Sequence, residues 1–296
     1  MTRYKALIEL IRPKQWVKNL FVFLPMFFGG HMNTAEAWIE ASLAFVSFSL
    51  IASAVYCIND VQDRDSDRLH PVKRSRPVAS GTVSPFAATV LSIFLVGAAE
   101  CVTWFGIQDG GMAVAAIISF YFVLNLAYTF GLKKIAIVDV IIIAFGFVLR
   151  LFAGGYACDI ALSPWIVLMT FLLTLFLAFA KRRDDVVLRK RENIVVRQNT
   201  QHYNLAFMNH VLGILAAVTM VCYIMYTVSP EVIERFHSDY VYVSSVFVLA
   251  ALIRYFQLLI VLDKDGDPTR ILWTDRFIQC CGIIWLAFFA MLIYII

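Results

Sequence analysis

Residues 37–67 read AWIEASLAFVSFSLIASAVYCINDVQDRDSD. The first part, 37–57, is apolar over the roughly 20 residues that a helix needs to cross the hydrocarbon core of a bilayer. The second part, 59–67, is dense in carboxylates and follows that helix directly. The stretch therefore predicts a membrane-spanning helix with a polar site at one interface.

The composition of the whole chain is that of a membrane protein. Of its 296 residues, 61% are hydrophobic and only 16% are charged, whereas charged residues make up about 25% of an ordinary soluble domain. A soluble fold of this length could not bury so much apolar surface in one core, so we expect the lipid bilayer as its solvent. This balance excludes a soluble nucleic-acid-binding protein. The six cysteines form no CxxC or Cys/His pattern, so they indicate neither a metal cluster nor a disulfide framework.

Nine apolar runs are candidates for membrane spans. They cover 17–31, 37–57, 84–106, 111–130, 136–157, 162–180, 206–228, 239–260 and 275–296. The first run is short and contains Pro25, so we expect it to be kinked or tilted. Four spans separate the two long polar loops, 58–83 and 181–205, which suggests two four-helix halves and one additional helix. We therefore predict an all-α polytopic membrane protein of nine transmembrane helices, with a single catalytic domain over 1–296.

The basic residues are confined to alternate connections between these spans. They lie in the N-terminal segment, 58–83, 133–134, 181–197 and 254–276. The other connections hold only Arg235. Because cytoplasmic loops carry the excess of Lys and Arg, this pattern predicts that the N-terminus is inside and the C-terminus outside. Arg150 lies within a span, and an ionisable group at that depth usually faces a partner or a cavity. The sequence does not identify that partner.

The carboxylates that follow the second span are spaced to share one helix face. Asn59, Asp63 and Asp67 occur at intervals of four residues, and Asp60 lies beside them. Oxygen-bearing side chains stacked in this way repel one another without a cation, and Mg²⁺ takes such oxygens while it bridges to substrate phosphates. The spacing therefore predicts a Mg²⁺ site. The alternative is a solvated acidic helix end that pairs with neighbouring arginines.

Basic residues near this motif suit a substrate that carries phosphate. Lys73 and Arg76 follow in the same loop and can neutralise the remaining charge of a diphosphate. Lys14, Lys18 and Asn19 precede the first span and can reach a phosphate, although such residues also occur as interfacial anchors. The site is thus expected to bind a diphosphate-bearing substrate.

Several strings together resemble a known enzyme family. N-D-x-x-D-x-x-x-D at 59–67, followed by R-P-x-x-x-G at 76–81, resembles the first aspartate motif of the UbiA superfamily of intramembrane prenyltransferases. Further strings are similar to the decaprenyl-phosphate phosphoribosyltransferase branch of that superfamily: RPKQWVKN at 12–19, DRLHPVK at 67–73, and GDPT at 266–269 with DR at 275–276. The resemblance extends over essentially the whole chain.

The resemblance implies a nine-helix bundle whose cavity faces the cytoplasm and opens sideways to lipid. Members of this branch use Mg²⁺ and transfer the 5-phosphoribosyl group from 5-phosphoribosyl diphosphate (PRPP) to a polyprenyl (decaprenyl) phosphate. The products are polyprenyl-phosphoryl-5-phosphoribose and diphosphate. We therefore expect a multi-pass enzyme of a bacterial inner membrane, with a cytoplasmic active site and a role in cell-wall biosynthesis. Association into a homo-oligomer stays open, since no interface motif stands out.

Together, the residues and the resemblance assign roles to individual side chains. The expected metal ligands are Asn59, Asp63 and Asp67, and the expected catalytic residues are Asp60, Asp63, Asp67 and Lys73. The residues expected to bind substrate are Lys14, Lys18, Asn19, Arg76, Tyr128, Lys133, Asp139, Lys181 and Arg182. Among the latter, Tyr128, Lys133 and Asp139 match family positions that line the cavity.

One motif departs from the family pattern. UbiA prenyltransferases carry a second D-x-x-x-D motif after the sixth span, where this chain has adjacent Asp184 and Asp185 behind Lys181 and Arg182. Neighbouring helical residues diverge by about a hundred degrees, so two adjacent carboxylates cannot face one ion as an i, i+4 pair does. This departure weakens the first alternative function, a UbiA-type transfer of a prenyl group from prenyl diphosphate to an aromatic acceptor.

A second alternative belongs to another class of protein, a nine-helix transporter. Transporters usually place their polar residues near the bilayer midplane and break their helices there. In this chain the polar residues crowd at one interface, and Arg150 is the deep exception. The pattern therefore favours an enzyme.

Overall fold

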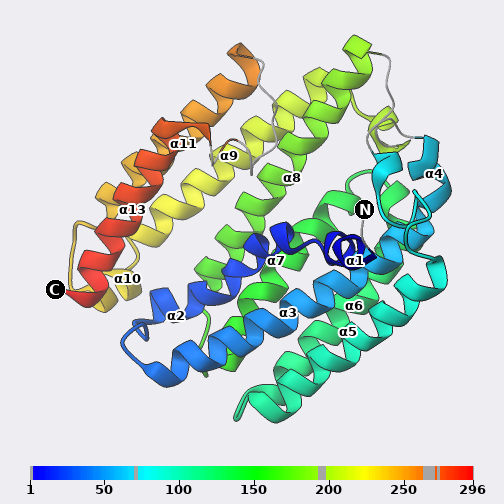
Figure 1. Cartoon of the computed structure of the whole chain (residues 1–296). Coiled ribbons are helices and arrows are strands. Elements are labelled where there is room, and N and C mark those ends of the chain that lie inside the picture. The colour runs from blue at the N-terminus through cyan, green and yellow to red at the C-terminus, as the bar shows by residue number, and fades with distance from the viewer. Residues whose placement is uncertain (1–2, 70–72, 193–197, 263–270, 272–273, 296) are drawn as a thin grey trace. The chain divides into compact units, whose positions relative to one another are not determined.

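The computed structural model describes residues 3–69, 73–192, 198–262, 271 and 274–295 (Figure 1). In this part of the chain the regular elements are all helices, which confirms the predicted all-α class. The chain divides into two compact units, Met1–Leu162 and Ser163–Ile296. The two units are described separately below.

Among the described residues, eight helical stretches are long and apolar enough to cross a membrane, and each unit holds four of them. The four of the first unit are Ala35–Gln62, Pro85–Gly106, Gly111–Phe130 and Val138–Ala157. The four of the second unit are Pro164–Lys190, Leu205–Thr227, Val241–Val261 and Arg276–Tyr294. They coincide with eight of the nine predicted runs, and the division into four and four agrees with the two predicted halves.

The remaining predicted run, 17–31, is built differently. It lies in an 11-residue 3₁₀ helix, η1 (Pro13–Phe23), and in the short α-helix α2 (Leu24–Gly29). Proline stands in the first turn of both helices, where its missing N–H removes no helical hydrogen bond. Gly30 ends α2 with a φ of 81°, a left-handed conformation that glycine adopts without strain. The irregularity expected from Pro25 is thus observed as a change of helix type.

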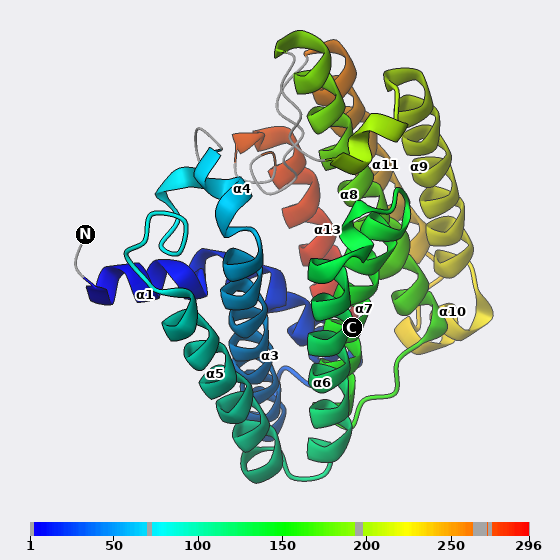
Figure 2. The same ribbon diagram turned by 90° about the vertical axis from the view of Figure 1, so that its right-hand side faces the viewer.

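In the first unit, α3 (Ala35–Gln62) is the central helix. Figures 1 and 2 show it beside α5, and it also contacts α6, α7 and η1. Its buried residues Phe48 and Ile51 pack in one apolar core with Ile118 of α6 and Ala153 of α7. The other elements of this unit are α1 (Arg3–Ile11), α4 (Arg64–Leu69), η2 (Lys73–Ser75), α5 (Pro85–Gly106), α6 (Gly111–Phe130), η3 (Leu132–Lys134) and α7 (Val138–Ala157).

The second unit is a set of long helices joined by short elements. It comprises α8 (Pro164–Glu192), η4 (Gln198–His202), α9 (Leu205–Thr227), α10 (Pro230–Phe236), η5 (Val241–Ser244), α11 (Ser245–Phe256), the π-helix η6 (Gln257–Val261) and α13 (Arg276–Tyr294). Within the unit, α8 packs on α9, and α11 packs on α13 and α9. Side chains cap two of these helices: Asn204 accepts from the N–H of Phe207, and Asp275 accepts from the N–H of Ile278.

Helix α8 corrects the prediction of a polar loop over 181–205. The helix continues to Glu192 and carries the charged stretch 181–190 on its last turns. Lys, Arg and Leu are good helix formers, and Arg182 lies 3.7 Å from Asp185 one turn further along. Charge therefore marks where this helix leaves its apolar section, but it does not end the helix.

Candidate active site

The acidic motif lies where α3 ends and α4 begins. Helix α3 ends at Gln62, and Asp63 is its cap. The N–H of Asp63 donates to the carbonyl of Asn59 at 2.9 Å, and the N–H of Asp67 donates to the carbonyl of Asp63 at 2.8 Å. Each of these bonds spans four residues, as in an α-helix. The backbone thus keeps the four-residue spacing on which the predicted stacking of Asn59, Asp63 and Asp67 depends.

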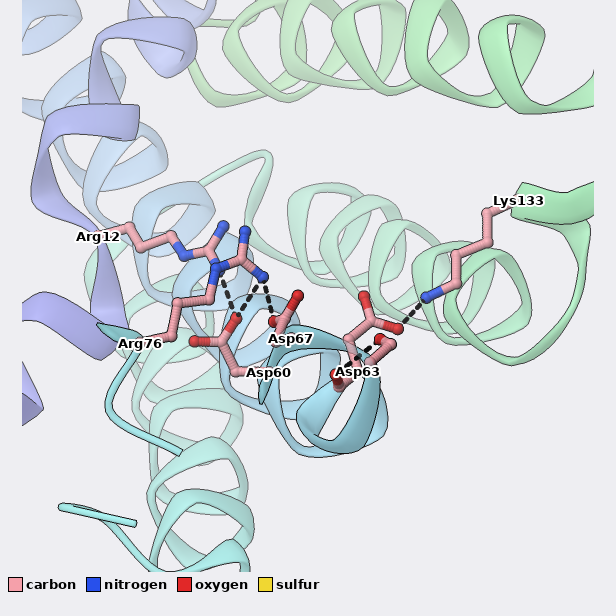
Figure 3. A network of polar contacts seen from close by, with 7 residues as sticks. Arg12, Asp60, Asp63, Asp67, Arg76 and Lys133 are labelled. Atoms are coloured by element: carbon pink, nitrogen blue, oxygen red, sulfur yellow. Dashed lines mark hydrogen bonds and ion pairs between the residues drawn. The ribbon is translucent and has the colours of Figure 1, made fainter. Parts of the chain in front are cut away.

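Asp60 is almost fully buried and pairs with two arginines from other segments. Its side chain is 2% exposed. Its Oδ1 accepts from Nη2 of Arg12 and, at 3.3 Å, from Nη1 of Arg76. Figure 3 shows the two guanidinium groups side by side above this carboxylate. Because a buried carboxylate is costly unless it is paired, these two arginines offset part of the cost of burying this charge.

The other two carboxylates of the motif are also paired. Nη1 of Arg76 donates to Oδ2 of Asp67 at 2.7 Å, so one guanidinium bridges Asp60 and Asp67. The ammonium of Lys133 donates to Oδ1 of Asp63 at 2.5 Å and reaches it from the opposite side of the motif (Figure 3). Three carboxylates and three cations thus form a charge-balanced group. We call Asp60, Asp63, Asp67, Arg12, Arg76 and Lys133 the acid–base cluster.

Arg12 is the member of the cluster that sequence reasoning missed. It stands between α1 and η1 in a left-handed conformation, with a φ of 51°. Its guanidinium also lies over the ring of Tyr56, 4.8 Å from the centroid. The sequence offered a signal, because Arg12 begins the RPKQWVKN string, but its charge was interpreted only as part of the basic N-terminal segment.

The residues of the motif fit a divalent cation by the chemistry of their donors. Oδ1 of Asn59 is buried and has no hydrogen-bond partner among the described residues. In that same part of the chain, each carboxylate of the cluster uses only one of its oxygens in the ion pairs. Carboxylate and amide oxygens are the ligands that Mg²⁺ prefers. No group of three or more His, Cys, Asp or Glu side chains among the described residues is arranged to hold a metal. A cation that binds Asp63 and Asp67 competes with Lys133 and Arg76, which already hold these carboxylates.

Other predicted site residues of the first unit lie on elements near the cluster in sequence. On η1, Lys14 is exposed and Lys18 is half-buried. Lys73 is half-buried on η2. Tyr128 is half-buried near the end of α6. Asp139 is fully buried in the first turn of α7, where the helix dipole favours a negative charge. The structure brings Lys133 and Arg76 into direct contact with the acidic motif, and the roles of the other residues stay predictions.

Asn19 has a different environment from the one expected of a phosphate ligand. It is 1% exposed. Its amide nitrogen donates to Oγ of Ser49 at 2.9 Å, and its amide oxygen accepts from Nε of Arg150 at 2.7 Å. The structure thus identifies the partner of Arg150 that the sequence did not reveal.

Lys181 and Arg182 belong to the second unit. Arg182 is buried on α8 next to Asp185, and Arg183 donates through Nε to Oδ1 of Asn209 at 2.8 Å. Asp185 is buried as well, so this carboxylate is part of a packed ion pair. The strings at 70–72 and 266–269 lie outside the described residues.

The sequence is similar to curated enzymes over nearly its full length. It is 32% identical to the decaprenyl-phosphate phosphoribosyltransferase of Mycolicibacterium smegmatis, over 98% of this chain and 92% of that protein. It is 30% identical to the enzyme of the same name from Corynebacterium glutamicum, over 98% of this chain and 87% of that protein. A digeranylgeranylglyceryl phosphate synthase of Sulfolobus acidocaldarius is 31% identical over 64% of this chain and 67% of its own length.

The fold is similar to solved structures as well. A UbiA homolog from Archaeoglobus fulgidus, bound to DMAPP and Mg²⁺, aligns with a TM-score of 0.72 at 20% identity, over 98% of this chain and all of that one. The UbiA prenyltransferase family matches residues 20–278. With its eight long apolar helices among the described residues, this chain is a multi-pass membrane protein that belongs to the UbiA prenyltransferase family.

Proposed function

We propose that this protein transfers the 5-phosphoribosyl group from PRPP to a polyprenyl phosphate, with decaprenyl phosphate as the model acceptor. The acid–base cluster carries the proposal, because it offers oxygens for a cation and basic groups for phosphates at the end of one long apolar helix. The similarity to decaprenyl-phosphate phosphoribosyltransferases over 98% of the chain supports this choice of substrates.

The donor binds through its diphosphate. Asn59, Asp63 and Asp67 would hold Mg²⁺, which when bound would neutralise charge on the leaving diphosphate. Arg76 and Lys133 then exchange their carboxylate partners for phosphate oxygens, with which both cations form charge-assisted hydrogen bonds. Lys73, which follows the motif in the same loop, adds a further positive charge.

The acceptor needs little activation. A polyprenyl phosphate oxygen is already anionic, so it attacks C1 of the ribose without a strong general base. The bond from C1 to the diphosphate breaks, a bond from C1 to the acceptor phosphate forms, and attack from the opposite face inverts the anomeric centre. Positive charge develops on the ribose in between, and carboxylates such as Asp60 stabilise it. Catalysis thus rests on positioning and electrostatics.

The proposal includes the location of the enzyme. The distribution of Lys and Arg supports a cytoplasmic acid–base cluster and N-terminus at a bacterial inner membrane, with the C-terminus outside. A water-soluble donor such as PRPP reaches that side directly, while the lipid-linked acceptor enters from the bilayer. The whole chain, 1–296, acts as one catalytic domain.

The alternative is prenyl transfer from a prenyl diphosphate, as suggested by the similar fold of a UbiA homolog bound to DMAPP. That reaction in this family uses a second aspartate motif. Here adjacent Asp184 and Asp185 on α8 diverge by about a hundred degrees, which disfavours them as joint ligands of a second metal. Phosphoribosyl transfer therefore remains the better supported reaction.

A membrane assay with matched donors tests the proposal. Purified enzyme with decaprenyl phosphate and Mg²⁺ should incorporate label from PRPP into lipid, and it should not do so from a labelled prenyl diphosphate. EDTA should stop the reaction. Asp63→Asn should abolish turnover while the protein stays folded, because the amide cannot supply the negative charge that the cation needs. Full turnover in EDTA, or near-normal activity of Asp63→Asn, would contradict the assignment.

A further inference from the structure

Arg150 is a buried cation that the proposed reaction does not use. It lies within the long apolar helix α7 and is 5% exposed. A charged side chain inside a membrane helix is costly, and such residues are retained where they serve a function. The question is what this guanidinium does.

Hydrogen-bond acceptors and aromatic rings of the protein surround the guanidinium of Arg150. Its Nε donates to Asn19, its Nη1 donates to the carbonyl of Gly146 at 2.7 Å, and its Nη2 donates to the hydroxyl of Tyr121 at 3.2 Å. Three aromatic rings face the guanidinium carbon, at 4.7 Å for Phe48, 5.0 Å for Tyr121 and 5.1 Å for Phe147.

This environment compensates the charge without a carboxylate. Among the described residues, no Asp or Glu lies within ion-pair distance of Arg150, and the stabilisation comes from carbonyl, amide and hydroxyl dipoles and from the ring faces. Little of the side chain is left to meet a ligand. Arg150 is therefore built to hold a protein segment rather than a substrate.

The segment that it holds is η1. A 3₁₀ helix of 11 residues has poor hydrogen-bond geometry and needs support from its neighbours. That support comes at three positions along η1. Trp16 donates to Oγ of Ser53 at 3.1 Å, Asn19 contacts Arg150, and the carbonyl of Val22 packs directly on α7 at Gly154.

The start of η1 connects this helix to the acid–base cluster. Arg12 is the residue immediately before η1, and its left-handed backbone sets the direction in which its side chain leaves the chain. From there it reaches Asp60. A shift or rotation of η1 would move Arg12 away from the carboxylate.

We propose that Arg150 is a positioning residue for the donor site, which fixes Asn19 and thereby holds η1 where Arg12 meets Asp60. The kinetic consequence rests on the proposed function, because it assumes that the acid–base cluster, which Arg12 helps to hold in place, binds the donor. The structural consequence, that η1 is displaced when Arg150 is lost, does not depend on the reaction.

The structural consequence is tested by ¹⁹F NMR of enzyme labelled with 5-fluorotryptophan. Trp16 reports on η1 and is assigned with Trp16→Phe, while the exposed Trp104 of α5 serves as an internal reference. Arg150→Met should shift or broaden the Trp16 resonance and leave that of Trp104 unchanged. The matched control is Ser92→Ala, which removes a buried hydrogen bond of 2.9 Å from α5 to the carbonyl of Ala54.

The kinetic test compares single and double variants. Arg150→Met should raise the KM for PRPP about tenfold and leave kcat within about twofold, as expected for a loss of uniform binding. Combined with Arg12→Ala, it should cause no further loss beyond that of Arg12→Ala alone, because both changes remove the same interaction. Arg150→Lys keeps the charge but not the planar fork, so it should restore only part of the donor affinity.

The outcomes separate the two proposals. An unchanged Trp16 resonance in Arg150→Met, or multiplicative losses in the double variant, overturns the role of Arg150. If Arg150→Met does not fold, Asn19→Ala removes the same hydrogen bond by replacing its acceptor, and the Trp16 resonance reports its effect. If the wild-type enzyme shows no turnover of PRPP, the proposed function fails, and the Trp16 resonance alone then decides the role of Arg150.

Discussion

Replacing Lys133 with methionine would separate two roles of this cation: pairing with Asp63 and binding the donor diphosphate. Lys133 holds Oδ1 of Asp63 at 2.5 Å, so a divalent cation that binds this carboxylate competes with the ammonium. The two side chains are 23% and 28% exposed, so this ion pair contributes roughly 1 kcal/mol, less than a fully buried pair does. Lys133→Met should therefore raise the affinity of the donor-free enzyme for Mn²⁺, used in place of Mg²⁺, about fivefold.

The same substitution should have the opposite effect on the donor. A hydrogen bond from a charged group contributes about 1.5–3 kcal/mol, so the affinity for PRPP should fall about 10- to 150-fold. Lys134→Met is the matched control, because Lys134 is the exposed neighbour of Lys133 on η3 and makes no ion pair with the described part of the chain.

Two binding measurements decide this prediction. Electron paramagnetic resonance counts free Mn²⁺ during a titration of the purified enzyme, and equilibrium dialysis with labelled PRPP measures donor affinity. Unchanged Mn²⁺ affinity in Lys133→Met would refute the displacement of Lys133 by the metal. An equal rise in Lys134→Met would refute it too, because the effect would then be a general change in surface charge.

Two further substitutions test the packing around the cluster. Asp60→Asn removes the charge that pairs with Arg12 and Arg76 and should lower the free energy of unfolding by about 1–3 kcal/mol, measured by denaturation in detergent. Gly154→Ala would place a methyl group 1.9 Å from the carbonyl oxygen of Val22, so it should lower thermal stability by about 3 kcal/mol. Gly213→Ala on α9 is its control: open space surrounds this position, so stability should be unchanged or slightly higher, and equal losses in both variants would contradict the packing at Gly154.

The long helices and the acidic motif could be predicted because each follows from a local requirement. A helix needs a fixed length of apolar sequence to cross a bilayer. This requirement predicted eight helices, and most of their ends lie within a few residues of the observed ones. The four-residue spacing of Asn59, Asp63 and Asp67 is a property of the helix itself, and the backbone bonds at 2.9 and 2.8 Å preserve it. Neither conclusion required knowledge of a tertiary contact.

The partners of buried charges could not be predicted, because they are set by tertiary contacts. Asn19 and Arg150 are 131 residues apart in sequence, and nothing local to either residue points to the other. Arg12 was missed for a similar reason, since its left-handed backbone and its contact with Asp60 exist only once η1 is in place. The end of α8 could not be located from charge, because the helix continues through its charged stretch to Glu192.

The balance of charges in the acid–base cluster predicts that metal and donor bind cooperatively. Three carboxylates and three cations neutralise one another without ligands. When Mg²⁺ and a diphosphate bind together, Asp63 and Asp67 exchange their basic partners for the metal, and Arg76 and Lys133 exchange theirs for phosphate oxygens. When only one of them binds, the displaced groups are left unpaired in a partly buried site, which is costly. Diphosphate should therefore raise the affinity for Mn²⁺ in the wild type, and the rise should be smaller in Lys133→Met, where the metal has no ammonium to release from Asp63. Equal Mn²⁺ affinity with and without diphosphate would show that the exchange of partners does not occur.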